Sequence, residues 1–438
     1  MKRILPLLLA LLLLPLAAVA AEYAPLPDAF NVAYTANTRL IKSEKAYVSK
    51  EYVTTAQPAV DAALKQIADR FDNKLSPTLT PLKNPARNSR LDINVLHSVS
   101  GKSLVSFQVL ARVSENRKQL QSPFECHTYD MTDGHEVFLT DLFPEDSQAW
   151  TVMADAVRST LDAYFPHITT DKKLLDTLCL PQVLLTTDFT LTPASLTLHY
   201  PAETLYPGRP TIMHVQIPYS AFKGMMTDYG TLQTDNNMYR LVALTYDDGP
   251  TYTNTARLIN TLRHAGARAT FFVLGNLIDE YPDITMREHD ENHSVQSHHW
   301  SHVDSSKSTA ARLLSGAEKM AEKMTQVIGA APIMMRPPYG TAQPFAKAGV
   351  PLPQILWNVD TKDWVDSRKP NGVLKVVREN TVPGSIILMH DITDITNDAT
   401  ALSLEWLRKQ NYLCVTVQEL AWHYGTELGN GKTYSNFK

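Results

Sequence analysis

The pattern of apolar and polar residues changes near residue 224. Before it, apolar residues at helical spacing predict helices over residues 58–71 and 148–164. Between and after them, short apolar runs bounded by polar turns predict strands over residues 91–95, 104–113, 136–139, 189–191, 196–200 and 213–218. This mixture predicts an α+β domain over residues 21–223, followed by a polar, aperiodic linker over residues 224–238.

From residue 239 onward, short apolar runs alternate with helical patterns. Helices are predicted over residues 255–265 and 308–328, each with its apolar residues on one face. The runs lie at residues 241–246, 269–274, 293–296, 333–335, 354–359, 385–389 and 412–417. Such alternation predicts a parallel β/α domain over residues 239–438, whether closed or open.

Five of these apolar runs end in a compact polar cluster. In chain order the clusters read DDGP (247–250), SHHWSH (297–302), RPPYG (336–340), DTKDW (360–364) and HD (390–391). One such cluster alone would suggest only a solvated loop. Because the carboxyl ends of parallel strands converge at the face of a β/α barrel that carries the chemistry, five clusters in order predict one shared site.

The first twenty residues have the layout of a secretory signal peptide. Lys2 and Arg3 precede an apolar stretch and the small residues 18–20. A membrane anchor is the alternative, but the stretch is short for a bilayer span and two prolines interrupt it. We therefore expect cleavage after Ala20 and a protein that is secreted, periplasmic or cell-wall associated, with no membrane contact afterwards.

Composition and charge narrow the class of protein further. With 41 basic and 45 acidic residues, the net charge of −4 argues against a cationic nucleic-acid binder. The three cysteines are too few for a disulfide framework. Cys126 and Cys179 could pair in an oxidising compartment, whereas Cys414 lies in an apolar run and is expected to be a buried thiol.

Asp248, His298 and His302 are candidate metal ligands. One carboxylate and two imidazoles, with a position left open for water, have the composition of a catalytic metal site. His298 and His302 are four residues apart, so one helical turn would direct both side chains to one side. This set suits Zn²⁺, and Co²⁺, Ni²⁺ or Mn²⁺ could also occupy it. The alternative is a pair of surface histidines. Asp247 is expected to have a separate role, because adjacent side chains of an extended segment diverge.

The motifs TYDDGP, HHWSH, RPPYG, DTKDW and LMHD, in this order, resemble those of the polysaccharide deacetylases, the family-4 carbohydrate esterases. The resemblance covers about residues 240–424. It implies a distorted (β/α) barrel that removes N- or O-acetyl groups from glycans with the help of one divalent metal.

The same resemblance assigns roles to individual side chains. It implies that Asp247 is the general base and His390 the general acid, a task that suits a side chain titrating near neutrality. Arg336 then holds Asp247, and Asp363 tunes His390. Ordinary salt bridges are the alternative for these two pairs.

The resemblance also implies a substrate pocket. The backbone N–H of Tyr339 would bind the oxyanion together with the metal, and Trp364 and Leu388 would enclose the acetyl methyl group. Core packing is the alternative for Trp364 and Leu388. His299 stands where the family usually has Ser or Thr, and it could offer a competing ligand or a different hydrogen bond in the loop.

We therefore expect a secreted, metal-dependent deacetylase that hydrolyses N-acetyl groups of cell-wall glycan, with peptidoglycan as the favoured substrate. Chitin oligosaccharides, exopolysaccharide and acetylated xylan are alternative substrates. A catalytically silent glycan-binding or sensing protein is the alternative from another class. Residues 188–220 weakly resemble a domain of bacterial exported proteins that precedes some peptidoglycan deacetylases, which implies cell-wall or protein contact; a structural spacer is the alternative.

Overall fold

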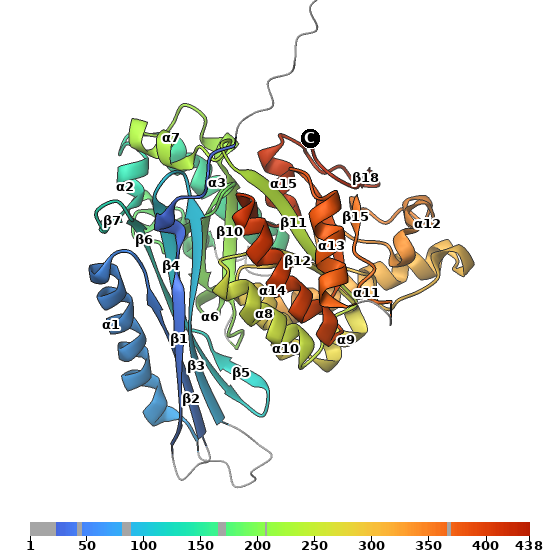
Figure 1. Cartoon of the computed structure of the whole chain (residues 1–438), viewed down its shortest axis with the longest axis horizontal. Coiled ribbons are helices and arrows are strands. Elements are labelled where there is room, and N and C mark those ends of the chain that lie inside the picture. Colours follow the sequence, from blue (N-terminus) through green and yellow to red (C-terminus); the bar gives the residue numbers. More distant parts are fainter. Residues whose placement is uncertain (1–22, 42–45, 81–88, 165–171, 206–207, 366–368) are drawn as a thin grey trace, which may run out of the picture.

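The computed structural model describes residues 23–41, 46–80, 89–164, 172–205, 208–365 and 369–438 (Figure 1). The expected signal peptide lies outside these residues. None of the helices in the described part of the chain combines the length and hydrophobicity needed to span a bilayer. Cys126, Cys179 and Cys414 are all free.

The N-terminal part contains a long, mostly antiparallel sheet in the order β1-β2-β3-β4-β6-β7, with β5 paired to β4. Only the β2–β3 pair is parallel. Helix α1 (Pro58–Leu75) packs its apolar face on this sheet through Val60, Leu64, Ile67 and Phe71. The strands are β1 (Ala33–Ile41), β2 (Ala46–Thr54), β3 (Ser89–Ser100), β4 (Leu104–Glu115), β5 (Lys118–Gln121), β6 (Phe124–Asp130) and β7 (His135–Val137).

A second, smaller antiparallel sheet has the order β10-β9-β8 and shares a core with helix α3. Its strands are β8 (Phe189–Leu191), β9 (Ser195–Pro201) and β10 (Ile212–Pro218). The helices of this part are α2 (Leu139–Leu142), α3 (Ala149–Tyr164), α4 (Lys172–Leu178), α5 (Pro181–Leu184) and α6 (Ala202–Leu205). Both long helices expected before residue 224 are confirmed. The expected strand over residues 136–139 instead gives way to α2 at Leu139.

The C-terminal part is built on parallel strands in the order β13-β12-β11-β16-β15, with β17 paired to β11. Isolated parallel bridges from Ser297 to Met335 and from Met335 to Gln354 continue the sheet from β13 to β14. This gives the expected distorted β/α barrel. Its strands are β11 (Arg240–Asp247), β12 (Ala269–Val273), β13 (Ser294–Ser297), β14 (Gln354–Ile355), β15 (Val359–Asp360), β16 (Ile386–His390), β17 (Tyr412–Cys414) and β18 (Thr433–Tyr434).

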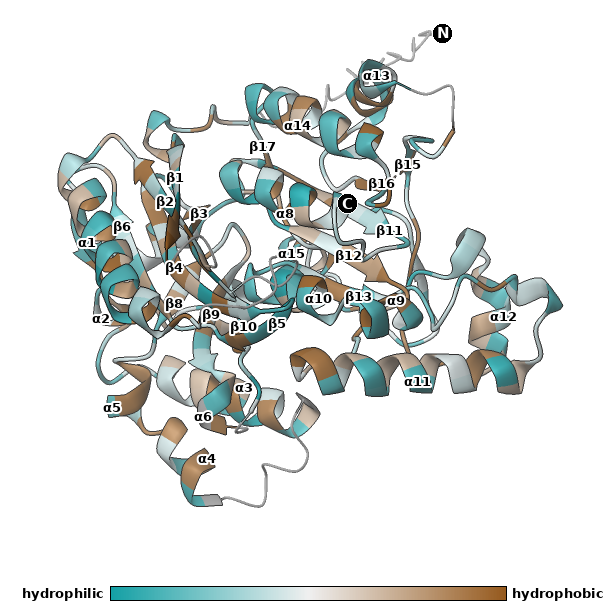
Figure 2. Cartoon of the chain, turned by 90° about the horizontal axis from the view of Figure 1, so that it is seen from below, coloured by the Kyte–Doolittle hydropathy of each residue, from teal (hydrophilic) through white to brown (hydrophobic). Residues whose placement is uncertain are grey.

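Helices surround these strands and bury one face each, so that hydrophobic colouring follows β11 and β12 while the helices carry both colours (Figure 2). The long helix α11 starts at the cap residue Thr309, whose side chain accepts a hydrogen bond from the N–H of Arg312, and stops at Gly329 with φ of +79°. The helices are α8 (Asn254–His264), α9 (Gly275–Glu280), α10 (Pro282–Asp290), α11 (Ala310–Ile328), α12 (Ala342–Lys347), α13 (Pro370–Asn380), α14 (Asp394–Lys409) and α15 (Val417–His423).

The segment expected to be a linker contains a short helix, α7 (Asp228–Thr234), that contacts the N-terminal part. The backbone N–H of Thr227 donates to the carbonyl of Leu142, and the buried Gln233 side chain donates to Ser103 Oγ at 3.0 Å. The division of the chain into domains at residues 223 and 239 stays a prediction.

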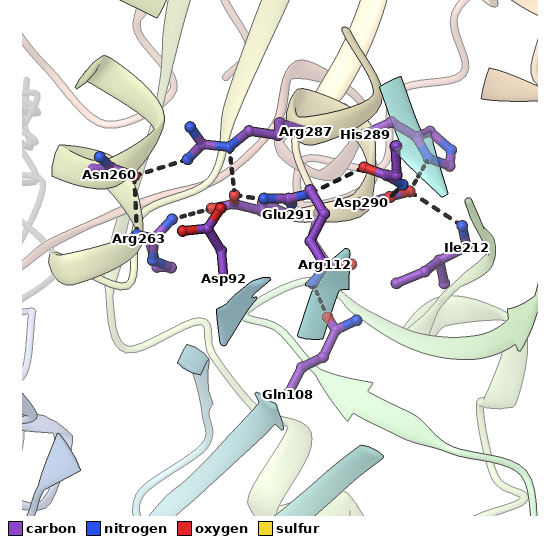
Figure 3. A network of polar contacts seen from close by, with 12 residues as sticks. Asp92, Gln108, Arg112, Ile212, Asn260, Arg263, Arg287, His289, Asp290 and Glu291 are labelled. Carbon is purple, nitrogen blue, oxygen red and sulfur yellow. Dashed lines mark hydrogen bonds and ion pairs between the residues drawn. The ribbon is translucent and has the colours of Figure 1, made fainter. Parts of the chain in front are cut away.

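The two parts share one hydrophobic core and a buried network of charges. The core joins residues of β2–β4 to residues of β11, β17 and α15. In the network, Arg263 on α8 donates to Glu51 on β2 at 2.9 Å. Arg263 also pairs with Glu291 (Figure 3). Glu291 also accepts from Arg287 at 3.0 Å and Arg112 at 3.2 Å. Burial alone would raise the pKa of Glu291, but these three guanidinium groups outweigh it and lower the pKa.

Replacing Glu291 with Gln should lower the free energy of unfolding by about 3 kcal/mol, because it removes a charge that compensates three buried arginines. Urea denaturation at neutral pH measures this effect. Since the folded-state pKa is lowered, the stabilisation is present above the unfolded value of about 4.3 and is lost as the pH falls below it. The exposed pair of Glu405 with Lys409 provides the control: Glu405→Gln should leave stability nearly unchanged, and equal effects of the two variants would contradict the assignment.

Candidate active site

Asp247 and His390 end two neighbouring strands of the barrel at the same level. In the parallel pairing of β11 with β16, Asp247 lies directly opposite His390, and Thr245 lies opposite Leu388. Directly paired residues of parallel strands point to the same face of a sheet, and alternate residues share that face. The side chains of Asp247 and His390 therefore stand together at the carboxyl edge of the sheet, with Thr245 and Leu388 one layer beneath them.

Asp248 departs from the extended conformation of β11. Its φ is +75°, in the left-handed region that only a few per cent of residues other than glycine adopt. Asp248 Oδ1 lies 3.4 Å and Asp247 Oδ2 lies 4.0 Å from Nε2 of His298. The expected extended backbone at residue 248 is therefore wrong, whereas the separate role expected for Asp247 stays a prediction.

His298 and His302 lie on the irregular loop that follows β13, so the expected helical turn between them is wrong. The backbone of His299 has φ of +70°, which interrupts any helix. The N–H groups of Gly275 and Asn276 donate to the carbonyls of His299 and Trp300 and fix the loop to the start of α9. His298 and His302 nevertheless face the same point, with ring centroids 5.2 Å apart.

His299 is not a competing ligand: its ring is directed away from the point that His298 and His302 face, and it holds the loop in place. Its ring is buried, and its two nitrogens lie 3.1 Å from the carbonyl of Ser301 and 3.2 Å from that of Leu313. The ring occupies the space beside Gly316 on α11, where any side chain would overlap it. His299 therefore supplies a loop hydrogen bond.

Asp248, His298 and His302 have the geometry of a metal site. Their ligand atoms all lie within 4.8 Å of one another. Asp248 Oδ1 is 3.4 Å from His298 Nε2 and 3.7 Å from His302 Nε2. Tetrahedral coordination with bonds of about 2.0–2.2 Å places ligand atoms roughly 3.4 Å apart. The three side chains thus stand at distances that one small cation can bridge.

The hydrogen bonding of these side chains leaves lone pairs facing one another. Nδ1 of His298 donates to the carbonyl of Arg336 at 2.7 Å, so a neutral His298 presents the lone pair of Nε2 to Asp248. Asp248 Oδ1 is buried and has no hydrogen-bond partner among the described residues. Burial lowers the pKa of His302 and favours its neutral, ligating form. A divalent cation fits this set, because Asp248 Oδ1 is a buried carboxylate oxygen that faces imidazole nitrogens and accepts no hydrogen bond from the described residues.

Asp247 is held by Arg336. Nη1 of this fully buried arginine donates to Asp247 Oδ1 at 2.8 Å and to Thr245 Oγ1 at 2.7 Å. Its remaining donors reach the carbonyls of Ile355 and Leu356, each at 3.1 Å. Because every part of the guanidinium is engaged, Arg336 fixes one oxygen of Asp247 and leaves the other, Oδ2, directed toward His298.

Asp363 orients His390. Nδ1 of His390 lies 2.8 Å from Asp363 Oδ1, and the backbone N–H of His390 donates to Asp363 Oδ2 at 2.7 Å. Burial favours the neutral imidazole, but the hydrogen bond to Asp363 and the charges of Asp247 and Asp248 outweigh it and raise the pKa of His390 to about 9. His390 is therefore an imidazolium at neutral pH and can donate a proton.

The three residues expected to form the substrate pocket differ in exposure, and their role stays a prediction. Tyr339 has φ of +59° and is 67% exposed, and its ring lies 4.3 Å from the ring of His302. Trp364 is 58% exposed, in the segment after β15, whereas Leu388 is almost fully buried in β16. The exposed rings can contact a ligand at the surface, and Leu388 lies at depth.

The sequence interpretation assigned no individual role to three polar residues of the site. Thr245 accepts from Arg336, Thr396 donates to Asp363 Oδ2 at 2.5 Å, and Asp391 accepts from Thr255. Burial raises the pKa of Asp391 to about 7, and its carboxylate fills the space beside Gly249. Asp391 was visible as part of the last polar cluster, whereas the threonines gave no signal that separates them from ordinary strand and cap residues.

A parallel barrel whose mouth combines three side chains placed to hold a metal with a flanking carboxylate and an imidazole is typical of metal-dependent hydrolases. Residues 235–348 match the family model described as polysaccharide deacetylase. The chain is 37% identical over 193 residues to peptidoglycan-N-acetylglucosamine deacetylase PgdA of Listeria monocytogenes, which covers 44% of this chain and 41% of that protein.

Two further relatives are similar over comparable lengths. Peptidoglycan-N-acetylmuramic acid deacetylase PdaC of Bacillus subtilis is 32% identical over 181 residues, 41% of this chain and 38% of that protein. A peptidoglycan-N-acetylglucosamine deacetylase of Bacillus cereus is 32% identical over 205 residues, 44% of this chain and 93% of that protein. The chain therefore belongs to the polysaccharide deacetylase family, although it spans only about two fifths of the length of the first two relatives.

Proposed function

We propose that this protein is an exported, metal-dependent deacetylase that hydrolyses N-acetyl groups of cell-wall glycan, with peptidoglycan as its substrate. The observation that carries this proposal is the position of an acid and a base on either side of one ligand set. Asp247, fixed by Arg336, and His390, protonated at neutral pH, are paired across adjacent strands beside Asp248, His298 and His302. The three relatives described above, all peptidoglycan deacetylases by name, support this choice of substrate.

In this proposal Asp248, His298 and His302 hold the cation. When bound, a divalent metal such as Zn²⁺, or Co²⁺, Ni²⁺ or Mn²⁺ in its place, supplies Lewis acidity toward the acetyl carbonyl and toward a water molecule. The backbone N–H of Tyr339 donates to the oxygen that becomes negative as the amide is attacked. Trp364 and Leu388 enclose the acetyl methyl group and orient the amide.

Proton transfer falls to the two paired side chains. Asp247 Oδ2 accepts the proton of the attacking water, and the hydrogen bond from Arg336 to Oδ1 holds this carboxylate in position. His390 donates its proton to the departing amine, which otherwise is a poor leaving group. Asp363 holds the imidazolium in place for this transfer.

Acetate release by the purified protein tests the proposal. Release from intact peptidoglycan should stop when a chelator removes the metal and should return when Zn²⁺ is added back in excess. The physical reason is that neither Asp247 nor His390 can polarise the carbonyl alone. Release that continues after metal analysis shows the protein to be metal-free would contradict the proposal, as would no release from the metal-loaded protein.

A further inference from the structure

A cleft of about 660 Å³ separates the barrel helices α8 and α10 from strands β2–β4 of the N-terminal sheet. The Glu291 network forms part of its wall, with side chains from both parts of the chain (Figure 3). The cleft is therefore made jointly by the two parts. Its lining includes six arginines, which are Arg90, Arg112, Arg117, Arg257, Arg263 and Arg287.

The lining is more cationic than the protein as a whole. It has three carboxylates, those of Glu51, Asp92 and Asp283, against the six arginines, whereas the entire chain has a net charge of −4. Five of the arginines form ion pairs with carboxylates. In the part of the chain that the structure describes, Arg117 forms none. The charge of Arg117 acts against the raised pKa of Asp283 in the same cleft, but the two residues form no ion pair. The exposed guanidinium of Arg117 can therefore still pair with an anionic ligand.

Arg117 is held in the cleft by an unusual turn. Asn116 and Arg117 form the two-residue connection between β4 and β5, with φ of +52° and +68°. Such turns favour Asn followed by Gly, because both residues are left-handed. Here the second position carries an arginine, and its guanidinium lies 3.9 Å from the ring centroid of Tyr252 in the barrel. The turn thus places a cation of the N-terminal part against an aromatic ring of the barrel.

Tyr252 connects this cleft to the candidate active site. It follows Asp248 by four residues, and four residues span at most about 14 Å, so a glycan of a few sugars can reach both. The loop between them is restrained, since the N–H of Thr251 donates to Thr255 Oγ1 at 2.7 Å. The Tyr252 ring is 45% exposed and can pack against a sugar.

We propose that this cleft binds the carboxylate-bearing part of the glycan while a neighbouring sugar presents its acetamido group to the barrel mouth. Arg117 pairs with a carboxylate of the substrate, and Tyr252 packs on the adjacent sugar ring. This inference rests on the proposed deacetylase function. It adds the place where the carboxylates of the substrate bind, and it favours acetylated glycan that carries carboxylates, as peptide-substituted peptidoglycan does and chitin does not.

Kinetics on two soluble substrates test this assignment: a peptidoglycan fragment with free peptide carboxylates, and a chitin oligosaccharide with the same number of sugars. At low salt, Arg117→Gln should raise KM about fivefold for the peptidoglycan fragment, the size expected for one exposed ion pair, and leave kcat unchanged. Both constants for chitin should stay unchanged. The difference should shrink as salt is added.

Lys118 provides a matched control. It is exposed in the same hairpin but does not line the cleft. Lys118→Gln therefore removes the same charge and should leave KM and kcat unchanged for both substrates. Arg117→Gly separates folding from binding: glycine suits the left-handed backbone, so the variant should keep its Tm while KM for the peptidoglycan fragment rises. Equal changes with both substrates, an equal effect of Lys118→Gln, or no effect of Arg117→Gln would each overturn the inference.

The experiments distinguish a wrong assignment of the cleft from a wrong assignment of the deacetylase function. If the wild-type protein releases acetate and Arg117→Gln has unchanged KM and kcat, the proposed binding of substrate in the cleft is wrong and the deacetylase proposal stands. If the wild type releases acetate from neither substrate, titration calorimetry with the peptidoglycan fragment measures its Kd and so tests binding in the cleft independently of catalysis. A fivefold weaker Kd in Arg117→Gln then supports it, and an unchanged Kd overturns it.

Discussion

Replacing Asp247 with Asn is expected to lower the rate of deacetylation by a factor of about 10²–10⁴ while the metal stays bound. The amide keeps the shape of the side chain and its contact with Arg336, but it cannot accept the proton of the attacking water. Asp247 Oδ2 is 4.0 Å from His298 Nε2, farther than Asp248 Oδ1 at 3.4 Å, so the ligand set remains complete. Acetate release and metal content are measured on the same sample.

Asp248→Asn is the matched comparison for this experiment. It should lose metal as well as activity, because Asp248 supplies the carboxylate of the ligand set. If Asp247→Asn loses the metal and Asp248→Asn keeps it, the roles of the two aspartates are reversed. Thermal unfolding of both variants shows whether either change acts through the fold.

The second large effect on turnover is expected for His390, the proposed general acid. His390→Ala should lower kcat by a similar factor of about 10²–10⁴ and leave metal binding intact, since His390 is outside the ligand set. Near-normal turnover of this variant would refute its role.

The pH dependence of kcat gives an independent check on His390. The proton donor is active only when it is protonated, and the pKa of His390 is raised to about 9. The wild-type rate should therefore persist through neutral pH and fall as the pH rises through about 9. His390→Ala should lack this alkaline limb in its residual rate, and an unchanged limb would assign it to another group.

The residues of the candidate site were predictable from the sequence because each follows a predicted strand, and the carboxyl ends of neighbouring parallel strands lie close together. Asp247, Arg336, Asp363 and His390 follow different apolar runs, and parallel pairing brings their ends together. Their local backbone was not predictable. Asp248 is left-handed in a loop whose next residue, Gly249, packs against the distant Asp391, and hydrogen bonds from α9 hold the loop of His298 and His302.

The N-terminal strands were predicted only in part. Strand β1 is exposed along most of its length, so it carries no apolar alternation and escaped prediction. The contacts between the two parts of the chain left no sequence signal either. Arg263 and Glu51 are separated by 212 residues, and neither lies in a sequence motif that predicts a buried ion pair.

The pairing of Asp247 with His390 has a consequence for how substrate preference can change. Neighbouring strands lie about 4.8 Å apart, and backbone hydrogen bonds maintain that spacing whatever side chains surround it. In the proposed mechanism, the sheet therefore fixes the distance between the proton acceptor and the proton donor. Tyr252 and Trp364 lie in turns and Tyr339 in a short 3₁₀ helix, all outside the sheet. Substitution of Tyr252, which takes no part in the proposed reaction, can therefore change the preference for one glycan over another while the distance between Asp247 and His390 stays the same.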